Sequence, residues 1–114
     1  MPLTKVHHRR AKDPKIVVSE PTLTVLLAQD EDGSYCAKCP ELDLVTQLSS
    51  AEAALKDLLA AVRDYAAEYL RERKLYSASP NRAHHRPYVD AIAACQTEWE
   101  LRTLIEIKHG LVHL

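Results

Sequence analysis

The sequence predicts an α+β domain in which one long helix covers one face of a three- or four-stranded sheet, with a second helix nearer the C-terminus. Residues 22–29 place apolar side chains at alternate positions, which is typical of a strand with one buried face. Asp32-Gly33 follows and predicts a hairpin turn, because glycine readily takes the positive φ of tight turns. From Ala51 to Leu70, apolar residues recur at steps of three and four, which indicates one buried face of a helix.

Three strands are expected before the long helix, at residues 22–29, 34–39 and 43–47. Pro40 ends the second strand, since proline has no N–H to donate to a neighbour. Ile16-Val17-Val18 is a further candidate for a short edge strand, stopped by Pro21.

Two serines compete to begin the long helix. Ser49 with Glu52 forms a capping box, whereas Ser50 can cap without a carboxylate at the third helical position. The helix is expected to run to about Lys74. Its last turn holds several basic residues, which complement the negative end of the helix dipole.

A second helix is expected after a polar connection at residues 75–86. Pro87 suits the first turn of this helix, because an N–H at that position would have no helical partner. The spacing gives the helix one apolar stripe, formed by Tyr88, Ile92, Cys95 and Trp99.

The last segment admits two interpretations. Leu101, Thr103, Ile105 and Ile107 alternate with charged residues, which favours a strand. Leu104 and Gly110 instead fit a helix that continues to His109. We favour the strand.

The chain of 114 residues is expected to form a basic, flexible arm at residues 1–15 and a single α+β domain at residues 16–114. Five basic residues and one acidic residue give the arm a charge of +4. Since the whole chain carries −1, the domain carries −5. No apolar run approaches the roughly 20 residues of a membrane span. Three cysteines without a dense framework suit a reducing compartment, so we expect a cytoplasmic protein.

A set of short motifs at fixed spacing resembles the HicB-like antitoxin family over residues 22–70. The motifs are Asp32-Gly33-Ser34-Tyr35, Ala37, Pro40-Glu41-Leu42, Val45-Thr46-Gln47 and Ser50-Ala51-Glu52-Ala53-Ala54-Leu55. The resemblance implies a β-β-β-α-β unit, a degenerate ribonuclease H-like domain without catalytic carboxylates. It also implies a partner, because typical members bind and block a small HicA-type toxin, an RNase with a double-stranded-RNA-binding fold.

Two features depart from the pattern of that family. Leu48 stands where the family usually has a glycine after the third strand. Many members also carry a C-terminal DNA-binding element, either helix-turn-helix or ribbon-helix-helix, and residues 87–114 contain no clear counterpart.

No catalytic, metal or cofactor site is expected. Gly33 and Gly110 are the only glycines, which excludes a glycine-rich phosphate loop. The expected strands carry no cluster of carboxylates for a metal-dependent nuclease. Cys36 and Cys39 lie three positions apart on an expected strand and therefore point to opposite faces, which argues against a shared zinc ion or a redox pair.

We interpret the chain as a non-enzymatic binding protein, either an antitoxin or an orphan relative of one. An acidic surface docked on a basic RNase toxin would cover the active site of the toxin, and complementary charge speeds such an encounter. The candidate contacts are acidic residues of the hairpin turn and the following loop, namely Asp30, Glu31, Asp32, Glu41 and Asp43.

Two alternatives remain open. One is a nucleic-acid-binding module that holds phosphates through Arg9, Arg10, Arg82, His84, His85 and Arg86. The other is a structural homo-oligomer without a toxin partner. Self-association into a dimer or tetramer is expected under each interpretation, because open sheet edges and exposed apolar residues invite pairing. No contact with a membrane is expected.

Overall fold

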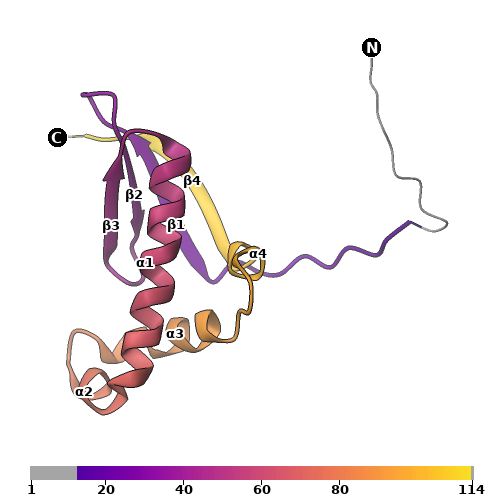
Figure 1. Cartoon of the computed structure of the whole chain (residues 1–114), viewed down its shortest axis with the longest axis vertical. Coiled ribbons are helices and arrows are strands. Elements are labelled where there is room, and N and C mark those ends of the chain that lie inside the picture. The colour runs from indigo at the N-terminus through magenta and orange to yellow at the C-terminus, as the bar shows by residue number, and fades with distance from the viewer. Residues whose placement is uncertain (1–12, 114) are drawn as a thin grey trace.

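The structure is a computed structural model that describes residues 13–113, and it contains a four-stranded sheet with a long helix lying across it (Figure 1). β1 (Leu23–Gln29), β2 (Tyr35–Cys39) and β3 (Leu44–Leu48) form an antiparallel meander. β4 (Ile105–Leu111) pairs parallel with β1, so the order across the sheet is β3-β2-β1-β4. The expected β-β-β-α-β unit is confirmed, with four strands.

The hairpin between β1 and β2 turns at the expected residues. Gly33 has a φ of +88° and donates its N–H to the carbonyl of Asp30 at 3.0 Å. A side chain at this φ would be strained, so the turn depends on glycine. The next turn, between β2 and β3, contains Asp43 at a φ of +56°, a conformation that aspartate tolerates better than most residues.

The long helix α1 (Ala51–Arg71) covers one face of β1, β2 and β3. It begins at Ser50, whose side chain accepts a hydrogen bond from the N–H of Ala53 at 3.1 Å. Of the two candidate caps, the structure therefore uses the second. The backbone leaves helical geometry at Glu72, so the expected end at Lys74 falls inside a separate short helix, α2 (Arg73–Ala78).

The hydrophobic core lies between α1 and the sheet. The sheet contributes Leu23, Val25, Leu27, Ala37 and Cys39, and α1 contributes Ala54, Leu55, Leu58, Leu59, Val62, Ala66 and Tyr69. These are the apolar positions that the alternation in the strands and the helical spacing select. Side chains on the opposite face of the sheet are more exposed, with Val45 64% exposed and Leu26 39% exposed.

Two short helical elements follow α2, and one expectation about them is wrong. η1 (Ala83–His85) leads into α3 (Arg86–Ala93), which carries Pro87 in its first turn as expected and packs against α1. The expected stripe from Tyr88 to Trp99 does not lie on one helix. Thr97 begins a new helix, α4 (Glu98–Arg102), by accepting a hydrogen bond from the N–H of Glu100 at 3.1 Å, and Trp99 is 75% exposed there.

The C-terminal strand is confirmed from Ile105 onward, and the alternative helix to His109 is wrong. The expected strand begins too early, however. Leu101 is buried within α4, and Thr103 ends that helix by donating its hydroxyl hydrogen to the carbonyl of Glu100 at 2.6 Å. Residues 101 and 103 alternate as in a strand, but the hydrogen bond of Thr103 stabilises the end of a helix there instead.

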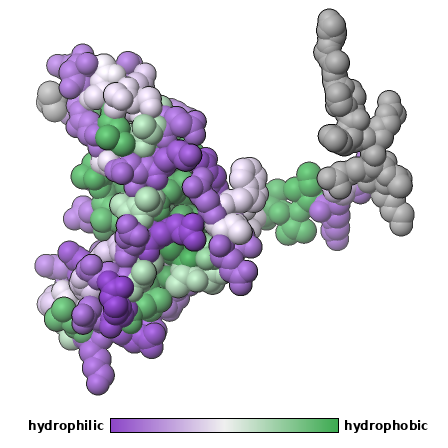
Figure 2. Space-filling model, in the orientation of Figure 1, coloured by the Kyte–Doolittle hydropathy of each residue, from purple (hydrophilic) through white to green (hydrophobic). Residues whose placement is uncertain are grey.

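The expected edge strand at Ile16-Val17-Val18 is wrong. The segment before β1 is extended but belongs to no strand, and these three side chains are 79–85% exposed. Figure 2 shows the resulting hydrophobic stretch between the body of the molecule and the grey residues. The strand that follows, β1, has β2 on one side and β4 on the other, so residues 16–18 cannot pair beside it.

None of the helices in the described part of the chain is long and apolar enough to cross a lipid bilayer. The division into an arm at residues 1–15 and a domain at residues 16–114 stays a prediction.

Candidate partner-binding surface

β3 is an outer strand of the sheet, and its free edge is flanked by exposed side chains. Val45 is 64% exposed on one face of the strand, and Leu48 is 38% exposed on the other. An outer strand presents unpaired N–H and C=O groups, to which another chain can hydrogen-bond. The edge of β3 therefore has both the backbone groups and the apolar side chains of a docking strand.

A row of carboxylates on α1 begins beside this edge. Asp57, Asp64 and Glu68 are separated by seven and four residues, and such spacing puts them on one face of a helix. The hydroxyl of Thr46 on β3 donates a hydrogen bond to Asp57 at 2.5 Å, which identifies this face as the one beside β3. All three acidic residues are exposed.

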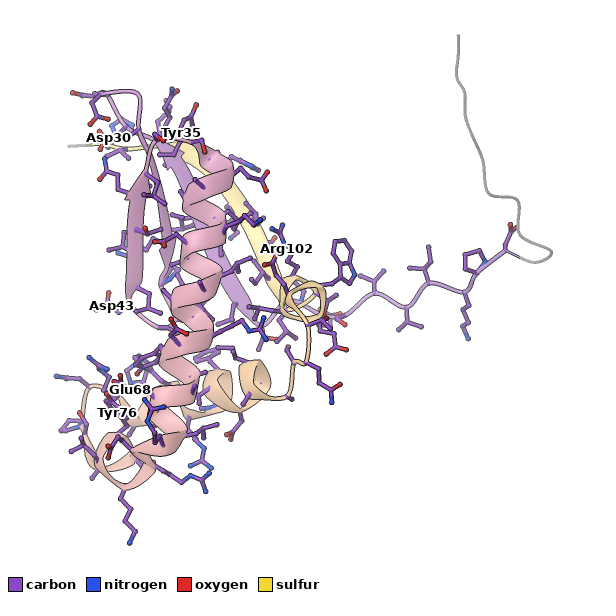
Figure 3. All side chains as sticks on the ribbon, viewed as in Figure 1. Asp30, Tyr35, Asp43, Glu68, Tyr76 and Arg102 are labelled. Carbon is purple, nitrogen blue, oxygen red and sulfur yellow. The ribbon has the colours of Figure 1, made fainter. Side chains whose placement is uncertain are left out.

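Further carboxylates lie at the two ends of β3. Asp30, in the first hairpin, accepts a hydrogen bond from the side chain of Gln47 on β3 at 3.0 Å. Asp43 directly precedes the strand and is exposed. Figure 3 shows Asp30 and Asp43 toward opposite ends of β3, and Glu68 further down α1 beside Tyr76. We call the set around this edge the acidic surface: Asp30, Glu31, Asp32, Asp43, Asp57, Asp64 and Glu68.

The first hairpin keeps its charges in fixed positions. The Ser34 hydroxyl and then the Ser34 backbone N–H donate hydrogen bonds to Asp32, at 2.6 and 2.9 Å, and these lower the pKa of that carboxyl. Asp30 also accepts a hydrogen bond from the N–H of Glu31 at 2.7 Å. The turn therefore presents ionised carboxylates on a backbone that their own hydrogen bonds restrain.

Glu41 differs from the other predicted contacts because its carboxylate is partly buried and hydrogen-bonded to another strand. It accepts hydrogen bonds from the backbone N–H and the hydroxyl of Thr24, at 2.9 and 2.8 Å. Burial opposes ionisation of Glu41, but these hydrogen bonds outweigh it and hold the pKa below its ordinary value. Glu41 thus joins the turn before β3 to the start of β1, and a partner would have to compete with Thr24 for it.

Three of the predicted nucleic-acid contacts meet at one cavity. Arg82, His84 and His85 line a cavity of about 660 Å³, together with Tyr65 of α1 and Asp43. Arg86 points elsewhere and forms an ion pair with Asp90 at 3.0 Å. Arg9 and Arg10 lie outside the described residues.

The tyrosines of α1 and α2 hold the arginine of this cavity. The guanidinium of Arg82 lies 5.4 Å from the ring centre of Tyr65 and 5.5 Å from that of Tyr76, within the range of cation–π attraction. Among residues 13–113, Arg82 forms no ion pair. His85 is only 4% exposed, and its Nδ1 lies 2.6 Å from the hydroxyl of Tyr65.

The cysteines of β2 point to opposite faces, as the alternation of a strand requires. Cys39 is fully buried in the core, whereas Cys36 is partly exposed. Burial raises the pKa of Cys39 to about 11, so this thiol is protonated at neutral pH. Within the described part of the chain, no group of three or more His, Cys, Asp or Glu residues is arranged to hold a metal ion.

Sequence reasoning missed the carboxylates on α1. Their shared face could be predicted from the sequence, since residues 57, 64 and 68 follow helical periodicity. The sequence does not reveal which sheet edge that face adjoins, because the direction in which α1 crosses the sheet is a tertiary property.

The sequence profile of one protein family matches residues 9–107 of this chain. That family is described as "Antitoxin of toxin-antitoxin, RelE / RelB, TA system". The chain belongs to this antitoxin family. The antitoxin class implied by the motifs in residues 22–70 is thereby confirmed, whereas the narrower HicB-like assignment stays a prediction.

A solved structure of an antitoxin part of a proposed toxin/antitoxin system from Syntrophomonas wolfei subsp. wolfei is similar to this chain. The TM-score is 0.69 at 25% sequence identity, over 78% of this chain. The chain spans 64% of the length of that protein. None of the curated proteins matches the chain.

Proposed function

We propose that the chain is a non-enzymatic antitoxin that binds a small basic RNase toxin and covers its active site. The observation that carries this proposal is the acidic surface along the free edge of β3, on a member of an antitoxin family. A toxin that binds RNA presents positive charge, so opposite potentials would steer the two proteins together. The edge strand would then supply backbone hydrogen bonds, and Val45 and Leu48 would supply apolar contact.

Two observations bear on the class of toxin, and they point to different classes. The motifs in residues 22–70 support a HicA-type toxin, whereas the description of the matched family supports a RelE-type toxin. Both kinds are expected to offer a basic surface to the same carboxylates. We propose the HicA-type toxin first, because the resemblance rests on residues that build β2, β3 and the start of α1, the elements that border the proposed surface.

The direct test is capture of the partner. The tagged chain is incubated with lysate of its native host, washed at moderate salt, and the retained proteins are identified by mass spectrometry. The proposal expects a small basic protein that cleaves RNA when released and stops cleaving when the chain is added back. Retention of no such protein, or RNA cleavage by the chain alone, would contradict the proposal.

We also propose that this function is performed in the cytoplasm. Cys36, Cys39 and Cys95 are all free thiols, which suits a reducing compartment. An RNase toxin must also be blocked where cellular RNA is found.

One observation favours nucleic-acid binding as a second candidate function. Arg82 stands at a cavity beside His84, held by tyrosine rings rather than by a carboxylate. Phosphate binding there predicts retention of RNA or DNA on a filter, with affinity that falls steeply as salt rises. If no nucleic acid is retained at low salt, this second function is excluded and the toxin remains the proposed partner.

A further inference from the structure

β4 is the second outer strand, and its backbone groups alternate between two directions. The carbonyl of Leu104 accepts hydrogen bonds from the N–H groups of Thr22 and Leu23, and the N–H of Val112 donates to Gln29. The even-numbered residues of β4 therefore direct their backbone N–H and C=O groups toward β1. Because successive residues of a strand face opposite sides, Ile105, Ile107 and His109 direct their N–H and C=O groups away from the sheet. In Figure 1, β4 forms one border of the sheet.

Two apolar side chains of β4, Ile107 and Leu111, are left exposed. α1 packs mainly on β1, β2 and β3, and of the apolar side chains of β4 Ile105 packs against the core. Ile107 pairs with the buried Val25 in the sheet and so points to the same face, yet it is 37% exposed. Leu111, near the end of the strand, is 73% exposed, and Trp99, in the helix that leads into the strand, is 75% exposed.

We propose that β4 pairs antiparallel with β4 of a second copy of this chain, about a two-fold axis at Ile107. The two sheets would join into one continuous sheet. Side chains of residues that face each other in such a pair lie on the same side of the sheet, so the axis must pass through a residue and not between two. The outward backbone groups of Ile107 would pair with each other, and those of Ile105 with His109.

The charges on β4 select this register. With the axis at Ile107, Glu106 of each copy faces Lys108 of the other, which forms two opposite-charge pairs. An axis one residue later would place Lys108 against Lys108, and an axis one residue earlier would place Glu106 against Glu106. Like charges directly opposite each other are unfavourable, so only the axis at Ile107 satisfies both residues.

The same symmetry brings together the exposed apolar ends of the strand. Antiparallel pairing puts the start of β4 in one copy beside the end of β4 in the other. Trp99 of each copy would therefore stand at the same end of the joint sheet as Leu111 of the other copy. Side chains that one chain leaves in water would then be covered by the second chain.

A second copy fits β4 better than it fits β3. The edge of β3 is flanked by carboxylates, which would repel their own copies across a two-fold axis. β4 instead carries one acidic and one basic residue in a self-complementary order. In the resulting dimer, both β3 edges would lie at the far borders of the sheet and remain open to a toxin. This inference stands independently of the proposed toxin surface.

Charge variants test the register by sedimentation of the purified full chain. Glu106→Lys and Lys108→Glu each create two like-charge pairs and should raise the dimer Kd by about tenfold or more. The double variant E106K/K108E should restore the Kd, and so should an equimolar mixture of the two single variants, through a heterodimer. Lys38→Glu, an equal charge change on β2, is the matched control and should leave the Kd unaltered.

Disulfide trapping locates the axis. Ile107→Cys should form a 107–107 disulfide between two copies under mild oxidation, because facing residues lie within the Cα separation that a disulfide spans. Gly110→Cys faces residue 104 of the second copy and should form no 110–110 disulfide. A wild-type chain that stays monomeric from micromolar concentration upward would overturn the proposal. A 110–110 disulfide without a 107–107 disulfide would also overturn it. So would a double variant that dimerises as weakly as the single variants.

Discussion

The hydroxyl of Thr46 on β3 lies 2.5 Å from the carboxylate of Asp57 on α1, to which it donates a hydrogen bond. This contact joins the helix to the outer strand on the solvent side of the core. It places Asp57 beside β3, and Asp64 and Glu68 follow on the same face of the helix toward α2, where Glu68 accepts a hydrogen bond from Tyr76. A surface with acidic side chains around an outer strand therefore follows from the packing of one helix on one sheet.

Removing charge from this row should slow the encounter with the toxin. D57N/D64N removes two negative charges, and the association rate constant at low salt should fall by about 3- to 10-fold, with a smaller effect at high salt. Stopped-flow or surface-plasmon measurements at two salt concentrations would provide both values. D13N/E20Q removes the same charge from the extended segment before β1 and is the matched control. Equal slowing by the control would mean that net charge, and not this surface, sets the rate.

The serine that caps α1 should be distinguishable from its neighbour. Ser50→Ala removes the acceptor for the Ala53 N–H and should lower the free energy of unfolding by about 1 kcal/mol. Ser49→Ala should change it by no more than a few tenths of that. Urea unfolding of the two variants measures the difference. A larger loss in the Ser49 variant would place the helix start one residue earlier.

Glu41→Gln should destabilise the fold, because the carboxylate accepts two hydrogen bonds from Thr24. Hydrogen bonds to a charged acceptor suggest a loss of about 1–3 kcal/mol at neutral pH. The pKa of Glu41 lies below its ordinary value of 4.5 in the folded chain. Its contribution is therefore complete above pH 4.5 and is lost as pH falls through the lower, folded pKa. In urea unfolding, the gap between wild type and variant should narrow steadily as pH falls below 4.5, and a gap that does not narrow would contradict this role.

His85 should make the fold less stable in acid. Burial, followed by the nearby positive charges of His84 and Arg82, lowers the pKa of His85 below its ordinary value of 6.5. The unfolded chain thus takes up a proton first, so stability is complete above pH 6.5 and is lost as pH falls through the folded pKa. Urea unfolding between pH 7.5 and pH 5 should show a smaller decline for His85→Gln than for wild type. His84→Gln removes one of the two nearby charges but leaves the buried ring, so its decline should lie between those of wild type and His85→Gln.

The first part of the fold could be predicted because its signals are local. Each element is predicted by a pattern within a few residues: the alternation in residues 22–29, the Asp32-Gly33 turn and the apolar stripe of α1. The motifs in residues 22–70 lie in this part, which explains why the antitoxin class was accessible from the sequence. Glu41 and Asp43, in contrast, are both acidic residues of one turn in the sequence. Only the contact of Glu41 with Thr24 distinguishes them.

The C-terminal part of the fold was harder to predict because helix and strand patterns overlap in its sequence. Residues 97–103 hold a capped helix of only five residues, within which Leu101 and Thr103 also satisfy a strand pattern. The pair Thr97 and Glu100 was the local sign of a helix start, and it explains why Trp99 leaves the stripe of α3. The segment at residues 16–18 has strand composition, but β4 occupies the side of β1 that β2 leaves open, which only the tertiary fold reveals.

Hydrogen exchange of the chain with and without its captured toxin tests the central claim most directly. Bound toxin should slow exchange of backbone amides in β3 and in the turns that hold Asp30 and Asp43. Exchange in β4 should be unaffected by the toxin. Protection of β4 or α3, with unchanged exchange in β3, would contradict the account and move the toxin to another surface.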